Sequence, residues 1–433
     1  MLIFNRKSSS SQIKPAELYK TTISIWVLMI LLSSAVFYFA MPGSSISDAI
    51  LESSASWTGT GIGAFDSAAV PVWLQLFRSV CNWIGGIGII MISLSILKPR
   101  RVMGWTLAAT EFPGPYFLKS DTDFRRYYRR IPLFYAALTV IQFLLLMVSM
   151  SPVQAAMTAL SNTSTAGLHH INNGVITGLP VQTKAIITLF AFLSSVYCPV
   201  FIYILRRKWN SLKDNSELKF YTGRILLAGI ILTAIIVIKA TDISPIKAFT
   251  SVIMQLVSSL STSGYIISDT STWPAECIII ITMMTFAGAC SLSTGGGFKS
   301  GRLLIALKMI SYSLYRQVHP NSIKSIKYDN KALKSEAVVS ANLFIALFMI
   351  TYFLGALLLS LDNVSLLEAL SYSRAMLTGS GIPLTCANAP GLATGFSAYG
   401  KIVMSFLMLA GRLEVYPLLM FLLKPFWKTD SSF

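Results

Sequence analysis

The sequence predicts an all-α polytopic membrane protein, in which four parallel repeats of span, half-helix and span surround a central axis. Three observations predict this class. The 433 residues are 54% hydrophobic and only 12% charged, with a mean hydropathy of +0.64, which is far more apolar than an average soluble domain. A glycine turn recurs in each quarter of the chain. Basic residues gather in alternate connections between the apolar segments.

Each recurrent turn places a small or hydroxyl residue directly before a glycine. The four pairs are Thr60 and Gly61, Ala166 and Gly167, Ser263 and Gly264, and Ser380 and Gly381. The first quarter has three alternate glycines, and Gly61 is selected because it lies five residues before Asp66, just as Gly264 lies five before Asp269. Glycine permits backbone angles that aim several carbonyls at one point.

A short helix is predicted before each turn. Ser45, Ser151 and Ser365 stand 16 residues before the glycines of their turns, and Ser244 stands 20 before Gly264, a difference of roughly one helical turn. Ser45 and Ser365 begin capping-box patterns, each with an acidic residue three positions on. Proline follows the other two and suits the first helical position. Each unit is therefore a capped half-helix that ends at a glycine turn.

Two spans accompany each half-helix. They are expected at about 22–41, 72–97, 131–150, 184–205, 224–238, 277–315, 340–361 and 398–423. Eight spans and four re-entrant half-helices result, and the even number of spans in each quarter makes the repeats parallel. The predicted division is a cytoplasmic tail at 1–19, repeat 1 at 20–98, a loop and repeat 2 at 99–208, repeat 3 at 209–318, and a loop and repeat 4 at 319–428.

The net charge of +17 is unevenly distributed. Of the 35 Lys and Arg residues, 28 lie before the first span, after the last or in alternate connections, while the other connections carry acidic residues. The positive-inside rule then predicts that both termini and the basic connections are cytoplasmic. This pattern favours a lipid bilayer and not a nucleic acid as the partner. The five cysteines have no paired or metal-like spacing.

The four turns are expected to meet on the central axis. A turn at membrane depth is tolerated only where its backbone lines a watery cavity or is buried in protein. The half-helices would direct their partially negative C-terminal ends at the axis, which favours a cation there. Rings of backbone carbonyls can replace the hydration shell of an ion. The sequence therefore predicts a central cation pore without an organic cofactor.

The sixth span must break at 288–297, because this segment is rich in Gly, Ser, Thr and Ala. Its candidate gate residues are Ser293, Thr294, Gly295, Gly296 and Gly297. Arg412 lies near mid-membrane in the last span, where a charge is costly unless it faces a cavity or a partner. Glu414, two positions on, points to another face of the helix. We expect Arg412 to face the cavity, with loop carbonyls as acceptors; the alternative is pairing with a neighbouring span.

Together these features resemble the pore-forming subunit of the Trk/Ktr/HKT superfamily of potassium transporters. The four turns carry the resemblance, with WIGGIG at 83–88, STGGGFK at 293–299 and GRLE at 411–414. It implies that potassium is the transported ion, that the four turn pairs form the filter, and that the loop closes the path from the cytoplasmic side. It also implies a homodimer in the cytoplasmic membrane and a cytosolic nucleotide-binding regulatory subunit. GRLE is Trk-like, whereas the eight-span layout lacks the extra N-terminal pair of spans of the Trk branch, so both branches stay open.

Two other function classes are less well supported by the sequence. A membrane-embedded transferase would use His169 and His170, but no carboxylate or nucleophile stands beside them. A proton- or sodium-coupled carrier of a small solute predicts acidic residues inside the spans, and apart from Glu414 the predicted spans contain almost none. The sequence favours a pore that is not an enzyme.

Overall fold

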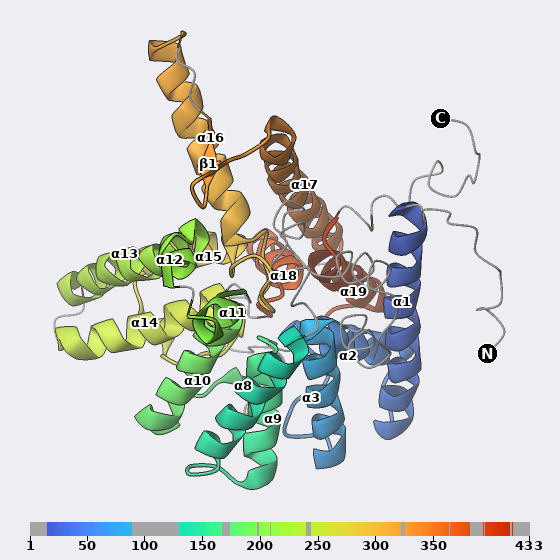
Figure 1. The fold of residues 1–433 in the computed structure, drawn as a ribbon. Helices are drawn as coiled ribbons and strands as arrows, with labels where there is room; N and C mark the ends of the chain where they lie inside the picture. Colours follow the sequence, from blue (N-terminus) through green and yellow to red (C-terminus); the bar gives the residue numbers. More distant parts are fainter. Residues whose placement is uncertain are drawn as a thin grey trace, which may run out of the picture.

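The computed structural model describes residues 15–88, 130–166, 174–196, 199–207, 209–239, 244–321, 325–362, 364–381, 393, 395–415 and 418. These residues form helices and one small hairpin. Figure 1 shows the helices fanned around a common centre, in groups that follow the order of the chain.

Each quarter contributes one group of helices. The first quarter contains α1 (Pro15–Ala40), α2 (Ile46–Thr58) and α3 (Val72–Ile87). The second contains α8 (Ile131–Leu146), α9 (Pro152–Thr163), α10 (Val181–Ser195) and α11 (Pro199–Leu205), and the short α12 (Trp209–Lys213) leads from it into the third. The third contains α13 (Ser216–Lys239), α14 (Pro245–Ser261), a 3-10 turn (Thr270–Thr272), α15 (Ala275–Ala287) and α16 (Ser300–Val318).

The fourth quarter begins with a hairpin. Strand β1 (Lys327–Tyr328) pairs antiparallel with β2 (Lys331–Ala332). The helices that follow are α17 (Ser335–Ser360), α18 (Leu366–Thr378) and α19 (Ala398–Arg412). We call α2, α9, α14 and α18 the half-helices, because they follow the four predicted N-cap serines.

The N-caps of the half-helices are confirmed. Ser45 and Ser365 make complete capping boxes with Asp48 and Glu368, while Ser151 and Ser244 cap helices that begin with proline. The half-helices have 13, 12, 17 and 13 residues, so the third is longer by about one turn, as its four extra residues predict.

The described residues support a multi-pass membrane protein. Among them, three helices are long and apolar enough to cross a membrane, at Tyr19–Ala40, Ser216–Lys239 and Ser335–Ser360. Shorter apolar helices are α8, α10 and α15. The count of eight spans stays a prediction, since the expected ends of the second and last spans lie outside the described residues.

The fourth and fifth predicted spans, among others, have different limits in the structure. The helix expected at about 224 begins at Ser216, where the side chain of Asn215 accepts from Leu218 N at 2.7 Å. The single helix expected at 184–205 is wrong, because α10 ends at Ser195. Val196 has an extended backbone, with ψ 151°, and Pro199 begins α11 without an N–H to donate into a continuous helix.

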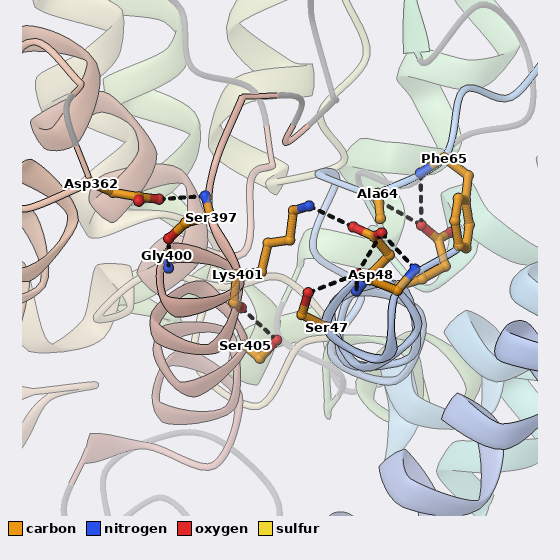
Figure 2. A network of polar contacts seen from close by, with 11 residues as sticks. Ser47, Asp48, Ala64, Phe65, Asp362, Ser397, Gly400, Lys401 and Ser405 are labelled. Carbon is orange, nitrogen blue, oxygen red and sulfur yellow. Dashed lines mark hydrogen bonds and ion pairs between the residues drawn. The ribbon is translucent and has the colours of Figure 1, made fainter. Parts of the chain in front are cut away.

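A glycine packs two helices of the first quarter together, and an ion pair joins this quarter to the fourth. A Cβ atom on Gly85 of α3 would lie 1.9 Å from the Trp57 carbonyl oxygen of α2, so only glycine permits this approach. The small residues of the WIGGIG segment therefore allow α2 and α3 to pack closely. On the other side of α2, Asp48 pairs with Lys401 of α19 at 2.6 Å (Figure 2).

Candidate pore and intramembrane loop

All four half-helices end at one cavity. Its lining from the four turns comprises Thr58, Gly59, Thr60, Ser164, Thr165, Thr262, Thr378 and Gly379. The C-terminal ends of these helices carry partial negative charge from unpaired carbonyls. The arrangement therefore provides a backbone-rich site that electrostatically favours a cation.

The described residues of the predicted filter lie within two positions of a residue that lines this cavity. Thr60 lines it, and every predicted filter residue that the structure describes is buried. A Cβ atom on Gly381 would lie 1.9 Å from the Gly61 Cα, so the first and fourth turns touch through their backbones. Gly381 and Gly264 have φ of +68° and +70°, angles that favour glycine. Gly167 lies outside the described residues.

The predicted break in the sixth span is confirmed. Helix α15 ends at Ala287 and α16 begins at Ser300, so the intervening loop, 288–299, is two residues longer than predicted. We call this segment the intramembrane loop. Its residues Thr294, Gly295, Gly296 and Gly297 line the cavity beside the turns. Ser293 is buried, and its hydroxyl donates to the Cys290 carbonyl at 2.5 Å.

Hydrogen bonds join the intramembrane loop to three of the turns. The contacts are Thr294 Oγ1 with Thr165 Oγ1 at 3.2 Å, Gly296 N to Thr262 Oγ1 at 2.8 Å, and Gly297 N to the Thr378 carbonyl at 3.1 Å. A Cβ on Gly296 would lie 1.9 Å from that same carbonyl oxygen. The loop therefore lies against the ends of the half-helices, and glycine is what allows the close contact.

The break between α10 and α11 provides further partners for the loop. Cys290 N donates to the Ser195 carbonyl at 3.0 Å, and Thr294 Oγ1 donates to the Ser194 carbonyl at 3.1 Å. These carbonyls belong to the last turn of α10, where a continuous helix would have used them itself. The break between α10 and α11 thus leaves carbonyls free to accept hydrogen bonds from the intramembrane loop between α15 and α16.

Arg412 lies on the wall of the cavity. Its Nη1 donates to the Thr294 carbonyl at 3.0 Å, and its Nη2 donates to the Gly85 carbonyl at 2.7 Å and to the Gly86 carbonyl. The guanidinium therefore joins the intramembrane loop to the end of α3. Glu414 pairs with Arg302 of α16 at 2.6 Å.

Two buried charged residues near the loop were missed as site residues. Lys299 is 1% exposed, lines the cavity and donates to the carbonyls of Ser293 and Gly295. A lysine at the end of a glycine-rich break in an apolar segment is the signal that could have identified it. Lys299 and Arg412 are thus two basic side chains on the cavity wall, which the acidic Glu414 also lines.

The second missed residue is Glu217 at the start of α13. Its Oε1 accepts from Ser291 N of the intramembrane loop at 2.6 Å, and its Oε2 accepts from the Tyr328 hydroxyl of the hairpin at 2.8 Å. Seven residues on, Arg224 Nη2 donates to the Gly288 carbonyl at 3.0 Å. One face of α13 therefore holds the beginning of the loop. Sequence reasoning missed Glu217 because it began this helix at about 224.

Half-helices whose C-terminal turns surround a backbone-lined cavity are characteristic of ion-conducting membrane proteins. The family model TrkH, described as a cation transport protein, matches residues 1–428, and the chain belongs to this family. The resemblance found in the sequence is confirmed.

Relatives match over nearly the whole chain. The Trk system potassium uptake protein TrkH of Escherichia coli K12 is 26% identical, with 99% of this chain and 89% of the relative covered. The corresponding TrkG protein of the same organism is 25% identical, with 98% and 88% covered. The crystal structure of the potassium transporter TrkH from Vibrio parahaemolyticus has the same fold, with a TM-score of 0.84, 22% identity, and 98% of this chain and 88% of that chain covered.

Proposed function

We propose that this protein takes up potassium ions across the cytoplasmic membrane through a filter made by the four glycine turns. The observation that carries the proposal is the single cavity at which all four half-helices end. Membership of a cation transport family and the names of the potassium uptake relatives support the same ion class. The transported ion is the substrate, and the chemistry is hydration-shell exchange on backbone carbonyls and not catalysis.

The proposed filter consists of the four turn pairs. They are Thr60 and Gly61, Ala166 and Gly167, Ser263 and Gly264, and Ser380 and Gly381. The backbone contact between Gly61 and Gly381 supports a closed ring, because it brings the first and last quarters together. The buried hydroxyls of Thr60, Ser263 and Ser380 hydrogen-bond within their own turns, which holds these turns rigid.

The proposed gate is the intramembrane loop together with Arg412. Support comes from their shared position on the cavity wall and from the hydrogen bond between Arg412 and Thr294. A positive charge in a confined, poorly solvated path repels a passing cation. Opening would require the loop to leave the half-helix ends, and three glycines at 295–297 lower the steric barrier to that rearrangement.

The proposed assembly is a homodimer that binds a cytosolic nucleotide-binding regulatory subunit. The eight-span topology with cytoplasmic termini is part of the same proposal. Support comes from the alternate distribution of basic residues, which concentrates positive charge on one predicted face. A pull-down and mass measurement of the purified complex in lipid nanodiscs would test it, with a monomer that binds no such subunit as the contrary result.

A flux assay in liposomes tests the function. Rubidium uptake that exceeds sodium uptake, and that needs no proton or sodium gradient, is the expected result. Movement of an organic solute, or rubidium flux that depends strictly on one of those gradients, would favour the coupled carrier instead.

A further inference from the structure

A buried carboxylate accepts hydrogen bonds from the backbone that follows the first turn. Glu52 lies in α2, nine residues before Gly61, and is fully buried. Its Oε2 accepts from Ala64 N at 2.8 Å and from Phe65 N at 3.3 Å. Figure 2 shows these two backbone N–H groups directed at one carboxylate. One side chain thus holds the segment that leaves the first turn.

The third turn has an amide in the corresponding place. Gln255 lies in α14, nine residues before Gly264, and is 2% exposed. Its Oε1 accepts from Ile267 N at 2.9 Å and from Ser268 N at 3.3 Å. In both turns the donors follow the acceptor by 12 and 13 residues. The first and third turns therefore share this pair of backbone hydrogen bonds to one buried side-chain oxygen, and we call the pair the bracket.

Glu52 and Gln255 differ in the partners of their other side-chain polar atoms. The carboxylate of Glu52 needs a counter-charge, and Arg78 of α3 supplies it, with Nε 2.7 Å from Oε1. Gln255 needs none, and its Nε2 donates at 3.2 Å to the carbonyl of Tyr265, the residue after Gly264. That carbonyl also accepts from Ser258 Oγ at 2.7 Å. A buried polar group without partners costs stability, so the ion pair with Arg78 and the amide hydrogen bond of Gln255 each lower the cost of burying their own acceptor.

We propose that Glu52 and Gln255 are positioning residues that set the ion selectivity of the first and third turns. They contact no ion; they hold the backbone on the far side of each turn glycine. Because selectivity depends on the number and spacing of coordinating carbonyls, release of this backbone loosens the ring that discriminates among cations. The inference rests on the proposed function, because it assigns these residues to that filter.

The test compares variants that differ in the bracket acceptor alone. Glu52→Gln with Arg78→Met copies the neutral arrangement of the third turn, whereas Glu52→Met with Arg78→Met lacks the acceptor. The full chain is reconstituted in liposomes, and the rubidium-to-sodium permeability ratio is measured. We expect the first double variant to keep the wild-type ratio within about twofold and the second to lower it by about fivefold or more.

Gln255→Met provides the same test in the third turn. We expect its ratio to fall by about fivefold or more while rubidium still passes. Ser271→Ala, at an exposed position of the same connection, is the control and should keep the wild-type ratio. Gln255→Asn, which withdraws the amide by one methylene, replaces Gln255→Met if that variant does not fold, and the same fall is expected.

The outcomes separate the two proposals. Unchanged ratios in folded, conducting Gln255→Met (or Gln255→Asn) and in the acceptor-free double variant would overturn the positioning role while leaving the filter in place. Wild-type protein that passes sodium as readily as rubidium would overturn the selective filter, and this inference with it, before any variant is considered.

Discussion

Arg412 donates a hydrogen bond of 3.0 Å to the carbonyl of Thr294, a residue 118 positions earlier in the chain. The bond joins the end of α19 to the intramembrane loop at the cavity where the half-helices end. The same guanidinium reaches the carbonyls of Gly85 and Gly86. One side chain therefore ties the loop to two helices from other quarters of the chain.

Arg412→Ala should raise basal rubidium flux without changing the rubidium-to-sodium ratio. It removes both the positive charge and three hydrogen bonds on the proposed gate. A rise of about tenfold corresponds to ~1.4 kcal/mol, a modest part of the repulsion between a poorly solvated charge and a passing cation. Arg412→Lys keeps the charge without the planar fork and should give an intermediate flux. A folded Arg412→Ala protein with lower or equal flux would contradict the gate.

Gly61→Ser should raise sodium permeability relative to rubidium, by about fivefold for ~1 kcal/mol of altered ion binding. The substituted residue is the one whose backbone contacts Gly381. Ion replacement measurements on the reconstituted variant provide the ratio. If Gly59→Ser changes selectivity and Gly61→Ser does not, then Gly59 and not Gly61 is the filter glycine of the first turn.

Glu217→Ala should both lower the thermal unfolding temperature and raise basal flux. It leaves the Ser291 N–H and the Tyr328 hydroxyl without their carboxylate, and a buried orphaned donor costs ~1–3 kcal/mol. Tyr328→Phe removes only the bond to the hairpin and should cost ~1 kcal/mol. Tyr312→Phe in α16 is the matched control. Thermal melts and flux measured on the same preparations test this prediction. A wild-type melting temperature and flux in Glu217→Ala would show that Glu217 does not support the loop.

Ser365→Ala should destabilise the protein by ~1 kcal/mol, because it removes a complete capping box at the start of α18. Ser151→Ala is the comparison, since that N-cap makes no side-chain cap hydrogen bond to α9. Thermal melts of the two variants should therefore differ, with the smaller loss in Ser151→Ala. Equal losses would mean that the capping box contributes nothing measurable.

Much of the fold could be predicted because local chemistry specifies it. Ser45 and Asp48 form a capping box within one turn of helix, and the glycine-rich stretch after Ala287 has a low helix propensity of its own. Sequence reasoning overlooked the local signal for the end of α10, since Pro199 has no N–H for the carbonyl of Ser195, four residues earlier. What the sequence could not show is that this carbonyl accepts from Cys290, which is far away in the chain.

The sequence by itself determined the class of membrane protein, the four capped half-helices, the turn spacing and the break before α16. Each follows from composition or from residues within a few positions of one another. Only the tertiary structure decided which groups surround the cavity, including Lys299, and which side chains brace the loop and turns. Glu217 meets Ser291 across 74 residues, and Arg412 meets Gly86 across 326. Such pairs depend on how segments far apart in the chain pack together. Burial then removes water from the charged groups, which makes hydrogen-bond and ion-pair partners necessary.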